Sequence, residues 1–178
     1  LRLVLHMLRQ PDSQTFQLAD ALTKVRSEIK FCKSCHNISD KELCEICSNP
    51  NRQDDLICVV EDIRDVMAIE ETGQYRGLYH VLGGVISPLD GVTAEDLNMD
   101  KLLQRVKDQS VEELILAVSP TIEGETTIYY ISKALKDEAV NLSQLGRGIS
   151  FGGELEYADE MTLGRSIVTR TPYKLSEL

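Results

Sequence analysis

The sequence predicts an α/β protein in which a parallel sheet is flanked by helices, with N-terminal helices and a small four-cysteine module in front of it. Three observations predict this organisation. From Leu56 onward, apolar runs alternate with amphipathic helical patterns, as in parallel sheets with helical crossovers. Two Cys-x-x-Cys pairs precede the first run, and two helical patterns precede the cysteines. A length of 178 residues suffices for one main core with an appended module.

The front of the chain predicts two short helices before the cysteines. Apolar residues follow helical spacing from Leu3 to Leu8, and Pro11 ends that helix because its ring cannot continue the preceding turn. Asp12 or Ser13 is expected to cap a second helix, whose apolar face comprises Phe16, Ala19, Leu22, Val25 and Ile29. Because Leu1 already belongs to the first apolar pattern, we expect a further segment to precede it.

The remainder of the chain predicts alternating strands and helices. Three apolar runs predict strands at residues 56–60, 78–82 and 114–118. The first run is continuous and β-branched, which is typical of a strand buried on both faces. One helix is expected from a cap at Asp62 to Gly73. A second follows a capping box of Thr93 and Asp96, and a third contains Ile128.

Composition excludes several classes of protein. Hydrophobic residues make up 42% of the chain and charged residues 27%, and the mean hydropathy is −0.17, as in globular rather than disordered or fibrous chains. No stretch approaches the roughly 18 apolar residues of a membrane-spanning helix, and no secretory leader pattern is present. We therefore expect a cytoplasmic protein without membrane association.

Charge is distributed unevenly along the chain. The formal net charge is −10, and the whole acidic excess lies beyond Cys58, so that the first part is neutral overall. This balance argues against a nucleic-acid footprint over the whole surface, although basic residues of the first part can contact phosphates. Those residues are Arg2, Arg9, Lys24, Arg26, Lys30 and Lys33. Solubility alone remains the alternative explanation for most of the carboxylates.

Two Cys-x-x-Cys pairs give the most specific local signal in the chain. They comprise Cys32, Cys35, Cys44 and Cys47, with eight residues between the pairs. Four thiolates complete the closed tetrahedral shell of one structural zinc, whose binding would fold a module that lacks a core of its own. A redox dithiol and a disulfide are the weaker alternatives. His36 could substitute as a ligand, whereas Cys58 is expected to be a small buried apolar residue.

Carboxylates follow two of the expected strands, at the sheet edge where open α/β sheets bind ligands. Glu61 follows the first strand, and Glu123-Gly124-Glu125 follows the third. This arrangement resembles the Toprim domain of topoisomerases, primases and recombination mediators, in which a strand-end Glu serves acid–base chemistry and a later pair of aspartates holds magnesium. The resemblance makes Glu61, Glu123 and Glu125 candidates for a weak Mg²⁺ site or for a surface that binds a basic partner.

The chain departs from the catalytic Toprim pattern at the magnesium ligands. Ser119 and Thr121 stand where that pattern has two aspartates, and neutral hydroxyls contribute no charge toward a hard divalent cation. We therefore expect no strand-cleaving activity and no catalytic residues. The alternative is a magnesium-dependent Toprim nuclease or primase-like enzyme that uses the three glutamates. Taken without the resemblance, the residues favour a solvated cluster that holds no ligand.

Further blocks of sequence extend the resemblance along the chain. They are Cys47-Ser48-Asn49-Pro50 with Arg52, Ile57-Cys58-Val59-Val60-Glu61, Gly84 with Ser87-Pro88-Leu89-Asp90-Gly91, Pro120-Thr121 with Glu123-Gly124-Glu125-Thr126, and Gly152-Gly153-Glu154-Leu155-Glu156. Together with the four cysteines and in this order, they resemble the RecR family of bacterial recombination mediators. The resemblance implies a DNA-repair adaptor of the RecFOR pathway. The implied partners are DNA (single-stranded and gapped duplex), RecO and RecF. The implied role is to help to load RecA onto single-stranded DNA.

The same resemblance implies a division of the chain into four parts. Residues 1–31 correspond to a helical remnant of a helix-hairpin-helix region, 32–47 to a zinc finger, 55–150 to the Toprim domain, and 151–178 to a Walker B-like and oligomerisation segment. A homotetramer or dimer is implied, with Arg2, Arg9, Lys24 and Lys30 as candidates for DNA contact. Because no phosphate-binding Walker A loop is present, we do not expect ATP hydrolysis. The implied location is the cytoplasm, in association with the nucleoid.

Overall fold

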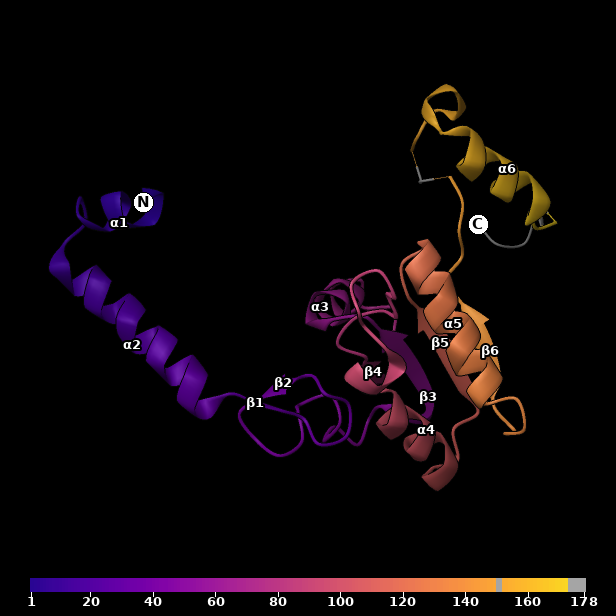
Figure 1. Ribbon diagram of the computed structural model, residues 1–178, viewed down its shortest axis with the longest axis horizontal. Coiled ribbons are helices and arrows are strands. Elements are labelled where there is room, and N and C mark those ends of the chain that lie inside the picture. The colour runs from indigo at the N-terminus through magenta and orange to yellow at the C-terminus, as the bar shows by residue number, and fades with distance from the viewer. Residues whose placement is uncertain (150–151, 173–178) are drawn as a thin grey trace. The chain divides into compact units, whose positions relative to one another are not determined.

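In the computed structural model the chain divides into two compact units, residues 1–143 and 144–178 (Figure 1). The structure describes residues 1–149 and 152–172. The expected irregular segment around Gly146 to Gly153 and the expected C-terminal segment 151–178 therefore lie partly outside the described residues. Within the described residues, no helix is both long and apolar enough to cross a lipid bilayer.

Two helices precede the cysteines, as the sequence predicts: α1 (Arg2–Met7) and α2 (Asp12–Glu28). The expected cap of α2 is wrong, because Pro11 takes the N-cap position in an extended conformation and its carbonyl oxygen accepts the N–H of Gln14 at 2.9 Å. Asp12 and Ser13 consequently lie inside the first turn, and no side chain caps the helix. The expected apolar face of α2 is exposed, with Phe16 at 68% and Leu22 at 60% of their full accessibility.

The central sheet has the strand order β4-β3-β5-β6. Its strands are β3 (Gln53–Val60), β4 (Gly77–Val81), β5 (Glu113–Ala117) and β6 (Asn141–Gln144). β3 pairs in parallel with both β4 and β5, and Val60 lies opposite Val81 on one side and Ala117 on the other. The three predicted strands are thereby confirmed, and their carboxyl ends meet at one edge of the sheet. β6 was not predicted, because its polar, largely exposed residues form no apolar run.

Helices connect the strands at the predicted places. They are α3 (Ile63–Glu71), α4 (Met99–Asp108) and α5 (Ile122–Ala134). Asp62 caps α3 in a reciprocal box with Asp65, and the chain leaves this helix through Gly73 at a φ of 64°. The capping box of Thr93 and Asp96 also forms, but it caps a 3-10 turn (η1, Ala94–Asp96) and α4 begins only at Met99.

Alternate residues of β3 enter cores on opposite faces of the sheet, as predicted for a strand buried on both sides. Ile57 and Val59 pack in one core with residues of α4 and α5, such as Leu102 and Ile131. Cys58 and Val60 pack in the other core, which includes Val66 of α3, Tyr79 and Val81. Because helices cover both faces, the edges and strand ends are the places left for chemistry.

The second unit contains a short 3-10 turn, η2 (Leu155–Tyr157), and one helix, α6 (Glu160–Val168). Asp159 caps α6 by accepting the N–H of Thr162 at 2.9 Å. Gly152 begins the expected Walker B-like segment in a turn with a φ of 79°. Among residues 144–149 and 152–172, no side chain is fully buried.

Candidate zinc centre and acidic strand ends

Short backbone hydrogen bonds shape the loops that carry the four cysteines. A two-residue hairpin, β1 (Lys30–Phe31) with β2 (Ile38–Ser39), encloses the first pair. The N–H of Cys32 donates to the carbonyl of Asn37 at 2.7 Å, and the N–H of His36 donates to the carbonyl of Cys32 at 3.0 Å. His36 makes the turn in the left-handed region, with a φ of 62°. These bonds form a tight knuckle that turns both thiols of the first pair inward.

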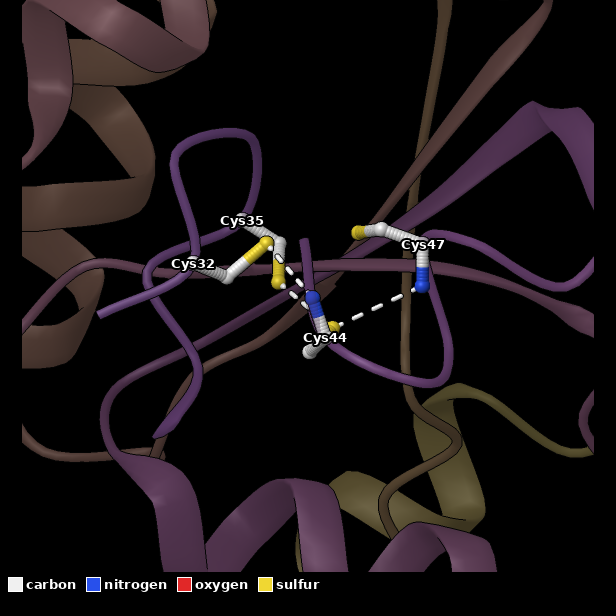
Figure 2. A group of neighbouring side chains, drawn as sticks. All are labelled: Cys32, Cys35, Cys44 and Cys47. Atoms are coloured by element: carbon white, nitrogen blue, oxygen red, sulfur yellow. Dashed lines mark hydrogen bonds between the residues drawn. The ribbon is translucent and has the colours of Figure 1, made fainter. Parts of the chain in front are cut away.

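The four sulfur atoms converge on one point, as Figure 2 shows. All of them lie within 4.8 Å of one another, and the Sγ atoms of Cys35 and Cys44 are 3.5 Å apart. A zinc ion bonded to four sulfurs at about 2.3 Å places them somewhat under 4 Å apart, so the cluster fits one zinc after small movements. Cys32, Cys35 and Cys44 are buried and Cys47 is partly buried, which leaves little access for water. The residues present therefore fit one closed structural zinc site.

Hydrogen bonds within the cluster favour deprotonated sulfur at Cys44, the form that binds zinc, whereas the contact with Cys44 is the main cause that raises the pKa of Cys35. Contact with the thiol of Cys35 is the main cause that holds the pKa of Cys44 far below its usual value. The backbone N–H of Cys47 also donates to the sulfur of Cys44, at 3.5 Å (Figure 2). The backbone N–H of Cys44 in turn donates to the sulfur of Cys32, at 3.3 Å. The loops thus supply backbone donors to the sulfurs of Cys32 and Cys44.

The zinc module is joined to the edge strand of the sheet. The carbonyl of Cys35 accepts the N–H of Val81 at 2.8 Å, so the first knuckle covers the open side of β4. Ile46 packs against both sheet cores and against the cysteine cluster. The ring of His36 lies edge-on to that of His80 in β4, with 5.8 Å between the centroids. His36 does not belong to the group of converging ligands, which contains the four cysteines.

A half-buried charge network holds the segment that leaves the zinc module. The Nη1 atom of Arg52 donates to Glu70 of α3 at 2.9 Å, and Nη2 donates to the other oxygen of this carboxylate. The hydroxyl of Tyr79 donates to Glu70 at 2.7 Å. The hydrogen bond from Arg52 is the main cause that lowers the pKa of Glu70, while burial is the main cause that raises the pKa of the Tyr79 phenol. The network therefore ties the linker to α3 and β4.

Cys58 stands apart from the zinc cluster. It lies in β3 with 2% of its surface exposed, and burial raises the pKa of its thiol to about 12. A thiol with such a pKa is inert at neutral pH. The prediction of a small buried apolar residue is confirmed.

The strand ends bring Glu61 and the residues after β5 together. One carboxylate oxygen of Glu61 accepts the backbone N–H of Ser119 at 2.5 Å. The Oγ1 of Thr121 accepts the N–H of Gly124 at 3.0 Å and thereby caps α5. Of the two residues that replace the aspartates of the catalytic pattern, Thr121 thus caps α5 with its side chain, whereas Ser119 contacts Glu61 through its backbone.

Glu123 and Glu125 lie in the first turn of α5, where their negative charge favours the helix N-terminus. Gly124 between them is required by close packing, because a Cβ atom at this position would lie 2.0 Å from the carbonyl oxygen of Ser119. Within residues 1–149 and 152–172, the four cysteines are the only group of three or more Cys, His, Asp or Glu side chains whose ligand atoms converge. A magnesium or partner site at Glu61, Glu123 and Glu125 remains a prediction.

Comparison with known proteins gives the same assignment along the chain. Residues 29–49 match the four-cysteine zinc finger domain of RecR, residues 55–146 the Toprim domain, and residues 148–171 the RecR C-terminal region. "Recombination protein RecR" of Flavobacterium psychrophilum is 58% identical over 176 residues, which cover 99% of this chain and 85% of that protein. The protein of the same name from Bacteroides thetaiotaomicron is 57% identical over 171 residues, covering 96% and 83%. The chain belongs to the RecR family.

Membership of the RecR family supports a role in recombination and DNA repair. The match to the four-cysteine zinc finger agrees with the converging sulfurs, and both fit one structural zinc bound by Cys32, Cys35, Cys44 and Cys47. The predicted Toprim fold, with its parallel sheet flanked by helices, is confirmed. When bound, the zinc would cross-link the two loops, and the four sulfurs would leave no coordination position open.

The basic residues proposed for DNA contact all lie exposed in the front of this RecR-family chain. Arg2 is in α1, Arg9 follows it, Lys24 is in α2 and Lys30 is in β1. Arg26 and Lys33 are exposed as well, but Lys33 pairs with Glu42 at 2.6 Å. No other carboxylate of the described residues pairs with any of these six residues. Their role in DNA binding remains a prediction.

Two features of the site had no sequence signal. Glu70 meets Arg52 from 18 positions further along the chain, Tyr79 donates to the same carboxylate, and only the folded sheet brings the three together. His36 and His80 likewise come from different modules. Neither set has a characteristic spacing, because each contact depends on how the zinc module docks on β4.

Proposed function

We propose that this RecR-family chain is a non-catalytic adaptor of the RecFOR pathway in DNA repair. It binds single-stranded and gapped DNA together with RecO and RecF, and it helps to load RecA onto single-stranded DNA. In this arrangement residues 1–31 contact DNA, 32–47 form the zinc finger, 55–150 form the Toprim domain and 151–178 contribute to a homotetramer or dimer. A closed ring of copies would convert weak phosphate contacts into firm retention on DNA. The protein acts in the cytoplasm, at the nucleoid.

The neutral side chains at positions 119 and 121 are the observation that supports a non-catalytic role. Ser119 offers its backbone N–H to Glu61, and Thr121 uses its hydroxyl oxygen to cap α5. Neither side chain supplies the anionic oxygen that Mg²⁺ prefers in proteins. Without the two aspartates, a metal-dependent cleavage site would lack carboxylates that hold the cation, and it is the cation that neutralises charge on a scissile phosphate.

The acidic strand ends instead suit contact with a basic partner protein. Glu61, Glu123 and Glu125 follow the ends of β3 and β5, on the same edge of the sheet. Such an edge repels the phosphates of DNA and attracts lysine- or arginine-rich surfaces. We assign DNA to the neutral front of the chain and the partner protein to this edge.

A cleavage assay separates the adaptor from an enzyme. Full-length protein is incubated with single-stranded, gapped and duplex DNA in Mg²⁺ and in Mn²⁺, beside the Glu61→Gln variant. The adaptor leaves all substrates intact under conditions in which it retains them in a gel-shift experiment. Metal-dependent cleavage that Glu61→Gln abolishes would show instead a Toprim nuclease.

DNA binding is tested by the four basic candidates. Substituting Arg2, Arg9, Lys24 or Lys30 by Ala is expected to weaken binding to all sequences alike and to reduce the slope of log K against log salt by about 1 for each phosphate that is no longer bound. Lys107→Ala is the matched control, because Lys107 lies in the acidic part of the chain with Glu138 3.8 Å away. Unchanged affinity and slope in all four variants would contradict the assignment of DNA to this part.

A further inference from the structure

Arg105 is a buried cation in the last turn of α4. Only 6% of its surface is exposed. Its Nη1 donates to the carbonyl of Tyr79 in β4 at 2.7 Å, and its Nε donates to the side chain of Gln109 at 3.1 Å. Its Nη2 is closed to solvent and has no hydrogen-bond partner. A guanidinium in this position has lost its hydrogen bonds to water and has replaced only some of them with hydrogen bonds to the protein.

Among residues 1–149 and 152–172, no carboxylate forms an ion pair with Arg105. Ion pairs among the described residues include those of Arg52, Arg64, Lys33 and Lys107, and none includes Arg105. Buried arginines are ordinarily paired, because an isolated charge in a protein interior is strongly destabilising. Within the described part of the chain, the partners of this charge are therefore the carbonyl of Tyr79 and the side chain of Gln109, and no Asp or Glu side chain pairs with it.

The zinc centre lies across a cavity from this charge. A cavity of about 580 Å³ separates the zinc module from the sheet, and Cys47 and Ser34 line it on the module side. Arg105 and Gln109 line it on the side of α4. Four thiolates around one Zn²⁺ carry a net negative charge, which the low dielectric of a partly enclosed site leaves poorly screened. Asp54 is the other charged residue of this lining, and it is exposed and forms no ion pair with Arg105.

We propose that Arg105 is the counter-charge of the zinc tetrathiolate and a positioning residue for it, so that zinc binding by the module is coupled electrostatically to the Toprim sheet. The hydrogen bond to Tyr79 holds the guanidinium in place from the sheet side. An anionic ligand within the cavity is the weaker explanation, because Nη2 is closed to solvent and such a ligand could not touch it. A field acts without contact, and this role is independent of DNA and of partner proteins.

Zinc affinity of charge-changing variants tests the proposal. Zinc-loaded wild-type protein, Arg105→Lys and Arg105→Met are titrated with a chromogenic chelator, and the zinc dissociation constant is taken from the competition. Arg105→Met is expected to bind zinc about tenfold more weakly, the lower end of the effect of outer-shell partners, whereas Arg105→Lys retains most of the affinity. Arg64→Met is the matched control and keeps wild-type affinity, because the side chain of Arg64 is 88% exposed and pairs with Asp62.

The stability of the two states separates a counter-charge from a purely structural role. If Arg105 compensates the zinc centre, Arg105→Met lowers the urea midpoint of the zinc-loaded protein but leaves unchanged or raises that of the zinc-free protein, where the buried cation is uncompensated. Loss of the hydrogen bond to Tyr79 alone would lower both midpoints equally and leave zinc affinity unchanged. That result, or equal decreases of zinc affinity in Arg105→Lys and Arg105→Met, would overturn the proposal. If the zinc-free protein does not stay folded, the zinc affinities of the folded, loaded variants decide the matter alone.

Discussion

Gly124 lies in the first turn of α5, between Glu123 and Glu125, and brings the start of this helix against the loop after β5. A Cβ atom at Gly124 would lie 2.0 Å from the carbonyl oxygen of Ser119 and 3.2 Å from a methyl group of Val118. The closest atom belongs to the backbone, so it cannot rotate aside as the end of a flexible side chain could. Gly124→Ala must therefore push the helix start away from the sheet edge.

Two opposing effects set how much unfolding free energy Gly124→Ala loses. Alanine favours a helix over glycine by about 1 kcal/mol. Overpacking of a closely packed site costs about 1–3 kcal/mol and occasionally more. Because the contact with Ser119 falls far inside van der Waals distance, we expect the repulsion to dominate. The expected net loss is about 2 kcal/mol of unfolding free energy, or a decrease of roughly 4–8 °C in Tm for a chain of this size.

Urea and thermal unfolding followed by circular dichroism measure this loss. Gly164→Ala in α6 is the matched control, because no atom lies within 4 Å of the position that its Cβ would occupy. That substitution is expected to leave the midpoint unchanged or to raise it slightly, since only helix propensity changes. A Gly124→Ala protein as stable as wild type would refute the inferred close approach of α5 to Ser119.

Three further perturbations follow from the zinc centre and the buried charges. Cys35→Ala is expected to lose zinc and to unfold residues 30–50 while much of the central sheet persists. Zinc content and amide hydrogen exchange measure these effects, and a full zinc equivalent in the variant would contradict the prediction. Burial lowers the pKa of His80 from 6.5 to about 4, so the stability that its neutral form confers is present above pH 6.5 and is lost as pH falls through 4. His80→Gln should flatten the pH dependence of unfolding free energy in this range by up to about 1.4 kcal/mol per pH unit relative to wild type, and an unchanged slope would contradict this. Arg52→Met leaves Glu70 with the hydroxyl of Tyr79 but without its ion-pair partner and should cost about 2 kcal/mol in urea unfolding. Removal of the exposed pair in Arg64→Met should have a clearly smaller effect because water screens that pair; equal losses would contradict this.

Much of the fold was predictable because burial leaves a pattern in the sequence. β3 lies between two neighbouring strands and under helices on both faces, and its run of apolar β-branched residues is continuous for that reason. The strand β6 lies at the edge of the sheet with polar residues, so nothing distinguishes it from a loop. The start of α2 was misplaced because Pro11 satisfies the N-cap geometry without a side-chain acceptor.

The zinc site was predictable because its ligands are close in sequence, and its surroundings were not. Cys-x-x-Cys spacing alone places two sulfurs near one ion. The contacts of Arg105 with Tyr79, and of Cys35 with Val81, join segments 26 and 46 residues apart and depend on how the module docks on β4. The contacts of the carboxylates at the sheet edge were predictable in part. Parallel strands predict that Glu61 meets the segment after β5, but not that its partner is the backbone N–H of Ser119.

Titration of the folded, zinc-loaded protein with Mg²⁺ by isothermal calorimetry tests most directly whether the strand ends serve binding rather than bond cleavage. With Ser119 and Thr121 in place of aspartates, we predict no saturable heat below millimolar Mg²⁺, and the same trace for wild type and Glu61→Gln. A stoichiometric site of micromolar affinity that Glu61→Gln removes would contradict the account.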